Sequence, residues 1–204
     1  MDLTTSQVLP SKEEIAQFPR FQNLHTEQIQ VIQNLEQCEL VREELFQVAV
    51  FGFDSESKPT FHKGEVQTGP HLIQLATEHK TYLFQMNSET WDFLCPIFAN
   101  TQQLKVGFCL KNDAQLFRKK GIALNGVIDL AKCFGHLGLK QTVGVKTAVA
   151  VLLQQNFPKN RKISTSNWAN CRLTAAQMDY AAADAYACIL IYNRLKALNL
   201  LPKR

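Results

Sequence analysis

One segment constrains the fold more than any other: the continuous apolar run Val48–Phe53, which leads directly into Asp54-Ser55-Glu56. Such a run is typical of a strand covered on both faces, as in an α/β sheet. Residues two apart in an extended chain point to the same side, so Asp54 and Glu56 aim both carboxylates at one point just beyond the expected strand end. This pair raises one carboxyl pKa or binds a cation such as Mg²⁺ or Mn²⁺. For the motif taken alone, a solvated turn is the alternative.

Strand-like and helix-like segments surround this strand. Further strands are predicted at 29–33, 71–77, 80–86, 105–110 and 127–130, and helices at 35–45, 91–99, 111–120, 143–155 and 174–198. A capping box at Ser11–Glu14 predicts a short helix before them, and 158–171 is a basic, irregular stretch. We expect one α/β domain at 28–204, a mixed sheet of five to six strands flanked by helices, preceded by an N-terminal extension at 1–27.

The composition excludes several classes of protein. With 46% hydrophobic and 20% charged residues the 204-residue chain is not disordered, and no apolar run is long enough for a membrane helix. The start lacks the pattern of a secretory signal, so we expect a soluble cytoplasmic protein without a membrane partner. The six dispersed cysteines fit neither zinc knuckles nor a disulfide scaffold, and we expect reduced core residues. The net charge of +4 suits an anionic partner but does not establish one.

Two further acids occur at unexpected places. Asp113 follows the predicted strand 105–110, at the end where α/β sheets bind ligands, although an Asp in the first turn of a helix also complements the helix dipole. Thr174–Gln177 is a second capping box, which fixes the register of the last helix. In that register Tyr180 and Asp184 lie one turn apart on a stripe that continues as apolar. A structural Asp bonded to an amide or an Arg is the alternative for this position.

The order DxE, then D, then YxxxD resembles that of the DEDD superfamily of 3′→5′ exonucleases, in its tyrosine-containing branch near ribonuclease D and the Werner-type exonuclease domain. The matching segments are 53–56, 106–113 and 173–186, together with Ser166-Asn167-Trp168. The resemblance covers roughly residues 29 to 198. It implies a ribonuclease H-like fold, and an enzyme that releases 5′-mononucleotides from the 3′ end of DNA or RNA.

The resemblance also implies roles for individual residues. Asp54, Glu56, Asp113 and Asp184 would hold two divalent cations, Mg²⁺ or Mn²⁺, that clamp the phosphodiester. Tyr180 would orient the attacking water, since a phenol is a poor base. Replacing Tyr180 with Phe is therefore expected to harm activity less than replacing Asp54 with Ala.

Basic residues near the motifs are the candidate contacts to a nucleic acid. Lys111 and Asn112 adjoin Asp113, and Arg161 and Lys162 belong to the basic run 159–162; a second run is 118–120. Solvated surface charge is the alternative for both runs. Trp168 is expected in the core rather than stacked on a base. Asp129 is expected to be structural, and Asp179 lies off the Tyr180 stripe.

Two other functions remain open at this stage. One is a catalytically silent nucleic-acid-binding module, although every ligand carboxylate is present. The other is a two-metal hydrolase of short oligonucleotides or nucleotides. The chain also departs from the resembled family, with Ser57-Lys58-Pro59 where Werner-type enzymes more often have Trp. At this length we expect no helical domains of the kind that follow the nuclease in ribonuclease D. The sequence predicts neither the preference for DNA or RNA nor the oligomeric state.

Overall fold

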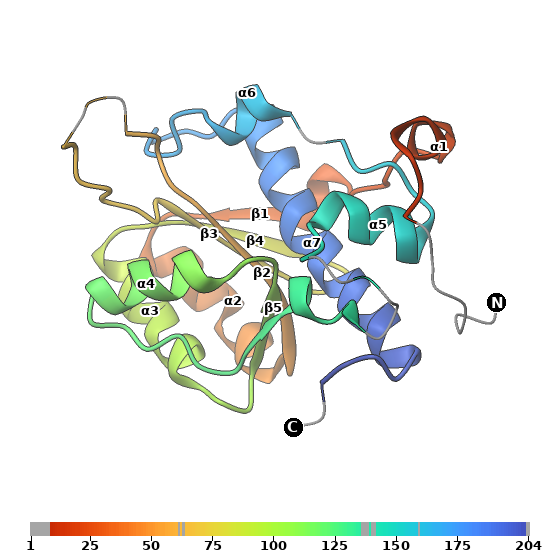
Figure 1. Cartoon of the computed structure of the whole chain (residues 1–204). Coiled ribbons are helices and arrows are strands. Elements are labelled where there is room, and N and C mark those ends of the chain that lie inside the picture. Colours follow the sequence, from red (N-terminus) through yellow and green to blue (C-terminus); the bar gives the residue numbers. More distant parts are fainter. Residues whose placement is uncertain are drawn as a thin grey trace.

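The computed structural model describes residues 9–60, 62, 64–135, 139, 142–158 and 160–202. Within these residues six strands form one mixed sheet, in the order β1-β4-β3-β2-β5-β6. The strands are β1 (Ile29–Ile32), β2 (Val50–Glu56), β3 (Leu72–Ala76), β4 (Thr81–Gln85), β5 (Leu104–Gly107) and β6 (Val127–Asp129). β3 runs antiparallel to both neighbours, whereas β2 pairs with β5, β5 with β6 and β1 with β4 in parallel. The predicted mixed sheet is confirmed (Figure 1).

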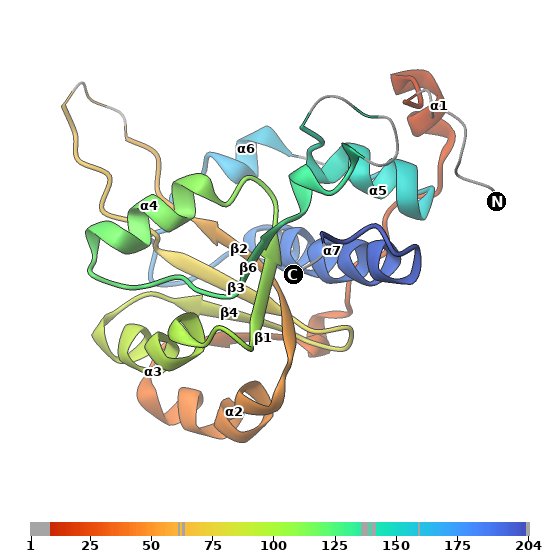
Figure 2. The same ribbon diagram turned by 60° about the horizontal axis from the view of Figure 1, so that its bottom comes forward.

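Helices cover both faces of the sheet (Figure 2). One face packs against α2 (Leu35–Gln47), α3 (Ser88–Ala99) and the α4 helix (Lys111–Lys119), around a cluster that includes Phe53, Phe84 and Phe117. The other face packs against α5 (Val145–Leu153) and the long α7 (Ala175–Ala197). A third, smaller cluster joins Trp168 and Tyr180 to Leu72 and Leu83. The domain is thus a three-layer α/β structure, and its ribonuclease H-like architecture follows the expectation.

The two strands expected to end beside the site have different ends from those predicted. β2 continues through Asp54 and Glu56, because β3 pairs with it as far as Glu56 opposite Leu72, so the prediction of a strand ending at Phe53 was wrong. β5 ends at Gly107 instead of residue 110. The reason is local: Cys109 has a left-handed backbone with φ of 57°, which cannot continue a strand.

Other elements differ from prediction in smaller ways. Asn87 caps α3 by accepting from the Thr90 amide, so this helix begins at Ser88, three residues before the predicted start. The stretch 158–171 is not wholly irregular, since Asn160 caps the short helix α6 (Arg161–Ser164). The capping box at Ser11 and Glu14 is confirmed and begins α1 (Lys12–Gln17). The remaining elements are the 3₁₀ turns η1 (Thr26–Gln28) and η2 (Leu130–Lys132).

The cysteines are free, as expected, but not all are in the core. Cys38, Cys133 and Cys188 are buried and Cys95 is partly buried, whereas Cys109 and Cys171 are exposed because both lie in loops. Among the described residues, no helix has the length and apolarity needed to cross a membrane.

The placement of α7 on β2 depends on a glycine. A Cβ atom built on Gly52 would lie 2.1 Å from the carbonyl oxygen of Ala185 and 2.9 Å from the amide nitrogen of Ile189. The helix backbone therefore rests directly on the strand, a distance that only glycine permits. The Thr174–Gln177 capping box, confirmed in the structure, fixes where α7 begins. The contact at Gly52 and the capping box at Thr174 and Gln177 together determine which α7 side chains face the end of β2.

Candidate active site

Three carboxylates gather where α7 crosses the end of β2. Asp54 and Glu56 share the face of β2 on which Gly52 contacts α7, and Asp184 points toward them from the helix. One carboxylate oxygen of each residue lies within 4.8 Å of those of the other two. Asp184 is buried, at 4% exposure, and the two strand acids are partly buried. The structure therefore brings these three predicted site residues together.

Tyr180 lies one helical turn before Asp184 and is also buried, at 8% exposure. Burial, then the negative charges of Asp184 and Glu56, raise the pKa of Tyr180 above its ordinary value, and its hydroxyl is hydrogen-bonded to Asp184. The phenol consequently stays protonated at neutral pH and acts as a hydrogen-bond donor. Trp168 is fully buried against it, with ring centroids 6.1 Å apart, so the expectation of a core role for Trp168 is confirmed.

Asp113 is held next to the trio rather than within it. It lies in the first turn of α4, which covers the opposite face of the sheet, and its Oδ1 accepts a hydrogen bond from the Ser55 hydroxyl at 2.5 Å. Ser55 alternates with Asp54 and Glu56 along β2 and so faces α4. Burial raises the pKa of Asp113 and the nearby Asp129 charge adds to this, while the Ser55 hydrogen bond opposes it. The sequence analysis missed Ser55, although strand alternation could have identified it.

Asp129 ends β6 and supports the turn that leads into α4. Its Oδ1 accepts hydrogen bonds from the amides of Cys109 at 3.0 Å and Ala131 at 3.1 Å. These bonds hold the left-handed residue of the β5–α4 turn and agree with the structural role expected of Asp129. Asp179 instead accepts from the Asn23 side chain, away from the Tyr180 stripe.

The candidate substrate contacts are all exposed. Lys111 and Asn112 lie at the start of α4, and Arg161 and Lys162 form the first turn of α6, while residue 159 of that basic run is outside the described residues. Lys111 also lines a cavity of about 770 Å³ along β6, together with Asp129 and Lys132.

The chemistry of this donor set fits divalent cations. Oxygen-only sites made of carboxylates suit Mg²⁺ and Mn²⁺. Three carboxylates within 4.8 Å of one another repel in the absence of a counter-charge, and a bound cation relieves that repulsion. Asp54, Glu56 and Asp184 are therefore the residues whose arrangement could hold a metal ion.

Comparison with known proteins agrees with this geometry. The family model described as 3′-5′ exonuclease matches residues 29–198. The bifunctional 3′-5′ exonuclease/ATP-dependent helicase WRN of Mus musculus is 32% identical over 155 residues, covering 74% of this chain and 11% of the relative. A 3′-5′ exonuclease of Arabidopsis thaliana is 26% identical over 155 residues, covering 74% of this chain and 54% of the relative. The chain thus spans only about a tenth to a half of these two relatives.

Solved structures share the fold. The Aedes aegypti Nibbler EXO domain superposes with a TM-score of 0.71 at 23% identity, covering 88% of this chain and 94% of that one. Trypanosoma brucei RNase D, crystallised with RNA U12, superposes with a TM-score of 0.71 at 17% identity, covering 90% of this chain and 64% of that one.

Proposed function

Because the chain belongs to the 3′-5′ exonuclease family, we propose that it hydrolyses phosphodiester bonds at nucleic-acid 3′ ends and releases 5′-mononucleotides, as a member of the tyrosine-containing branch. The observation that carries this proposal is the group formed by Asp54, Glu56 and Asp184 beside a protonated tyrosine. A nucleic acid as partner is also supported by the RNase D relative, which was crystallised with RNA.

The four carboxylates have distinct positions relative to the reaction. The trio would hold the cations, and Asp113 completes the donor set from the α4 side, oriented by the Ser55 hydroxyl. When bound, two divalent cations supply Lewis acidity at the phosphoryl group and lower the pKa of water. Asp184 is buried and Asp113 is partly buried, which reduces the solvent screening of their charges and strengthens cation binding.

Tyr180 has a positioning role in this scheme. Burial and the neighbouring carboxylates raise the pKa of Tyr180, so we assign the phenol a hydrogen-bonding role and not that of a base. Its hydroxyl is held at Asp184 and can orient the attacking water through a hydrogen bond. The exposed Lys111 and Asn112 on one side, and Arg161 and Lys162 on the other, would contact phosphates of the strand without reading its sequence.

The test is the release of label from 3′-end-labelled DNA and RNA oligonucleotides of matched sequence, in Mn²⁺ or Mg²⁺. Asp54→Ala is expected to abolish release, whereas Asp92→Ala, an exposed acid on α3, is expected to leave it unchanged. Equal release by the wild type and Asp54→Ala contradicts the proposal. Binding without metal-dependent release would indicate a silent module, and cleavage confined to the shortest members of a length series would indicate a hydrolase of small oligonucleotides.

A further inference from the structure

The side chain of Gln74 is a polar group inside an apolar layer. It lies in the middle of β3 and is 0% exposed, and neither its amide nitrogen nor its carbonyl oxygen has a hydrogen-bond partner among the described residues. Its neighbours on the same face of β3 are Leu72 and Ala76. An unsatisfied buried amide opposes folding, and an apolar side chain of the same size would fill this place without that cost. The amide therefore points to a task other than packing.

Strand pairing places Gln74 directly beside one of the three clustered carboxylates. Gln74 pairs with Asp54 across β2 and β3, and with Leu83 across β3 and β4. Directly paired residues share a face of the sheet, with Cβ atoms about 4.5–5.5 Å apart. Gln74 therefore lies with Asp54 on the face that α7 covers. Of its two cross-strand partners, Asp54 is the one that can accept a hydrogen bond through its side chain.

The helix α7 encloses Gln74 between two apolar clusters. Ala76 packs in the cluster that contains Ala185, whereas Leu72 packs in the cluster that contains Tyr180. Because Gln74 lies between Leu72 and Ala76 on the strand, it faces the segment of the helix that supplies the third carboxylate. A hydrogen bond to a carboxylate is stronger in such a water-poor enclosure than in solvent.

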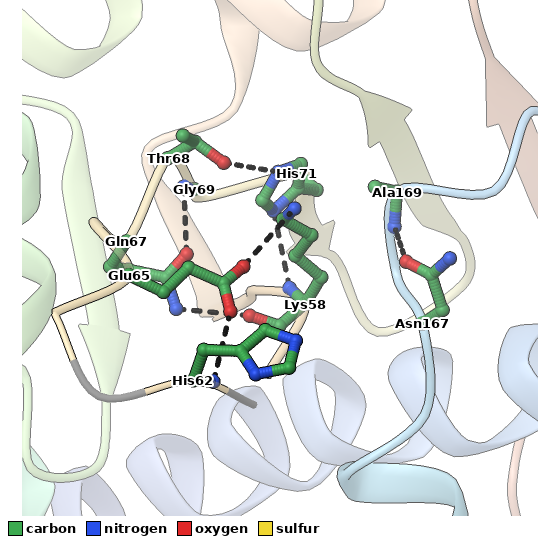
Figure 3. A network of polar contacts seen from close by, with 9 residues as sticks. All are labelled: Lys58, His62, Glu65, Gln67, Thr68, Gly69, His71, Asn167 and Ala169. Atoms are coloured by element: carbon green, nitrogen blue, oxygen red, sulfur yellow. Dashed lines mark hydrogen bonds and ion pairs between the residues drawn. The ribbon is translucent and has the colours of Figure 1, made fainter. Parts of the chain in front are cut away.

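The pairing of Gln74 with Asp54 is fixed by hydrogen bonds at the start of β3. His71 donates its amide to the Glu56 carbonyl at 2.8 Å, and its ring Nδ1 accepts from the Lys58 amide at 3.2 Å. Figure 3 shows His71 and Lys58 within the wider set of polar contacts that joins the two ends of the β2–β3 loop. Slippage of β3 along β2 would break these bonds, so Gln74 stays opposite Asp54.

The carboxylate of Asp54 can accept a further hydrogen bond. Its Oδ1 accepts from the Ser55 amide at 2.9 Å. A carboxylate has about four acceptor positions, so a second donor leaves room for a cation. Donors of this kind orient the carboxylates that bind metals in proteins, and their loss typically weakens metal binding by about 10–100-fold. A primary amide suits this role because it donates without adding a charge to the site.

We propose that Gln74 is a positioning residue of the metal site, whose amide donates a hydrogen bond to Asp54 and holds that carboxylate toward the cation. This inference rests on the proposed exonuclease function and adds a residue to its site. Gln74 has no exposed surface, so it acts through Asp54 and does not touch the nucleic acid. Removal of the amide therefore has opposite effects on folding and on metal binding: it relieves an unsatisfied group in the metal-free protein and weakens the binding of the cation.

The test replaces Gln74 with Met and, separately, with Leu, which are apolar side chains of similar size. Thr81→Val is the matched control, because Thr81 is also 0% exposed and its hydroxyl also lacks a hydrogen-bond partner among the described residues. Thr81 pairs with Ala76 across β3 and β4 and not with an acid. Three quantities are measured: the melting temperature of the metal-free protein, the Kd of Mn²⁺ from the paramagnetic resonance signal of the free ion, and the KM of a 3′-end-labelled oligonucleotide.

In the metal-free protein, both Gln74 variants and Thr81→Val are expected to melt at or above the wild-type temperature, because each loses an unsatisfied buried group. The Kd of Mn²⁺ is expected to rise about tenfold or more in both Gln74 variants and to keep its wild-type value in Thr81→Val. The KM of the oligonucleotide is expected to stay unchanged at saturating Mn²⁺.

A wild-type Kd of Mn²⁺ in both Gln74 variants overturns the inference, and is the result expected of an amide that only binds buried solvent. Melting temperatures of both variants well below that of Thr81→Val also overturn it, because the amide would then serve the fold. Failure of the proposed function has a different signature: the wild type releases no label with Mn²⁺, although Gln74→Met still weakens the binding of the ion.

Discussion

Replacing Gly52 with Ala tests whether contact between β2 and α7 assembles the site. The added methyl would lie 2.1 Å from the Ala185 carbonyl oxygen, whereas ordinary van der Waals contacts of a Cβ lie at 3.4–4 Å. The obstructing atoms belong to the helix backbone and cannot rotate away as a side chain could. The helix must therefore move away from the strand, and it carries both Tyr180 and Asp184.

The size of the effect follows from that displacement. Overpacking of this kind costs about 1–3 kcal/mol of unfolding free energy. For a chain of this length, 2 kcal/mol lowers the melting temperature by roughly 4–8 °C. A displacement of roughly 1 Å at reacting groups lowers a rate about 100-fold. We therefore expect a moderately destabilised protein whose exonuclease activity falls far more than its folded fraction.

The assay combines urea unfolding with the release of labelled mononucleotide at a temperature where the variant is fully folded. Gly135→Ala is the control, because a Cβ atom there meets no other atom within 4 Å. Activity and unfolding midpoint of Gly52→Ala equal to those of Gly135→Ala would refute the argument that this contact sets the position of the helix acids.

Four further outcomes are expected. Tyr180→Phe should lower kcat about tenfold to a hundredfold and leave the affinity for Mn²⁺ unchanged, since it removes one hydrogen bond and no ligand; a total loss measured by label release would contradict this. Asp184→Asn should raise the melting temperature measured without metal, because it removes one of three like charges. In the wild type, Mn²⁺ at 100 times its Kd should raise the free energy of unfolding by about 2.7 kcal/mol, and Asp184→Asn should abolish this rise. Ser55→Ala removes the hydrogen bond that lowers the pKa of Asp113, so this pKa should rise. Because activity needs the ionised carboxylate, the acid limb of the pH–activity profile should shift to higher pH. Ser55→Thr keeps the hydroxyl and should preserve the wild-type pH–activity profile. Lys105→Met should lower the free energy of unfolding by about 2 kcal/mol or more, because the buried ammonium donates to three carbonyls. Burial lowers the pKa of Lys105 to about 8, so the wild type should gain stability relative to the variant as pH rises from 8 toward 10.5. Parallel stability–pH curves of the wild type and the variant would contradict this.

Local signals in the sequence were sufficient for the elements that carry the site. The apolar run of β2 and the capping box of α7 place Asp54, Glu56 and Asp184 in register without tertiary information. The alternation of the strand and the four-residue spacing of the helix then put each carboxylate on a definite face. Their convergence could be inferred because the three motifs occur together in a known order.

Contacts between distant segments were beyond the reach of the sequence. The end of β2 depends on the pairing of Glu56 with Leu72. The end of β5 depends on the left-handed Cys109, whose amide donates a hydrogen bond to Asp129. The Ser55–Asp113 hydrogen bond joins residues 58 positions apart. No local propensity encodes such pairs, because tertiary packing decides them.

The dependence of the site on α7 has a consequence for biosynthesis. A ribosome makes β2, which carries Asp54 and Glu56, before it makes α7, which supplies Asp184. A nascent polypeptide, or a fragment truncated before this helix, therefore carries an incomplete set of ligands. The proposed activity therefore requires that α7 has been made and has packed onto β2.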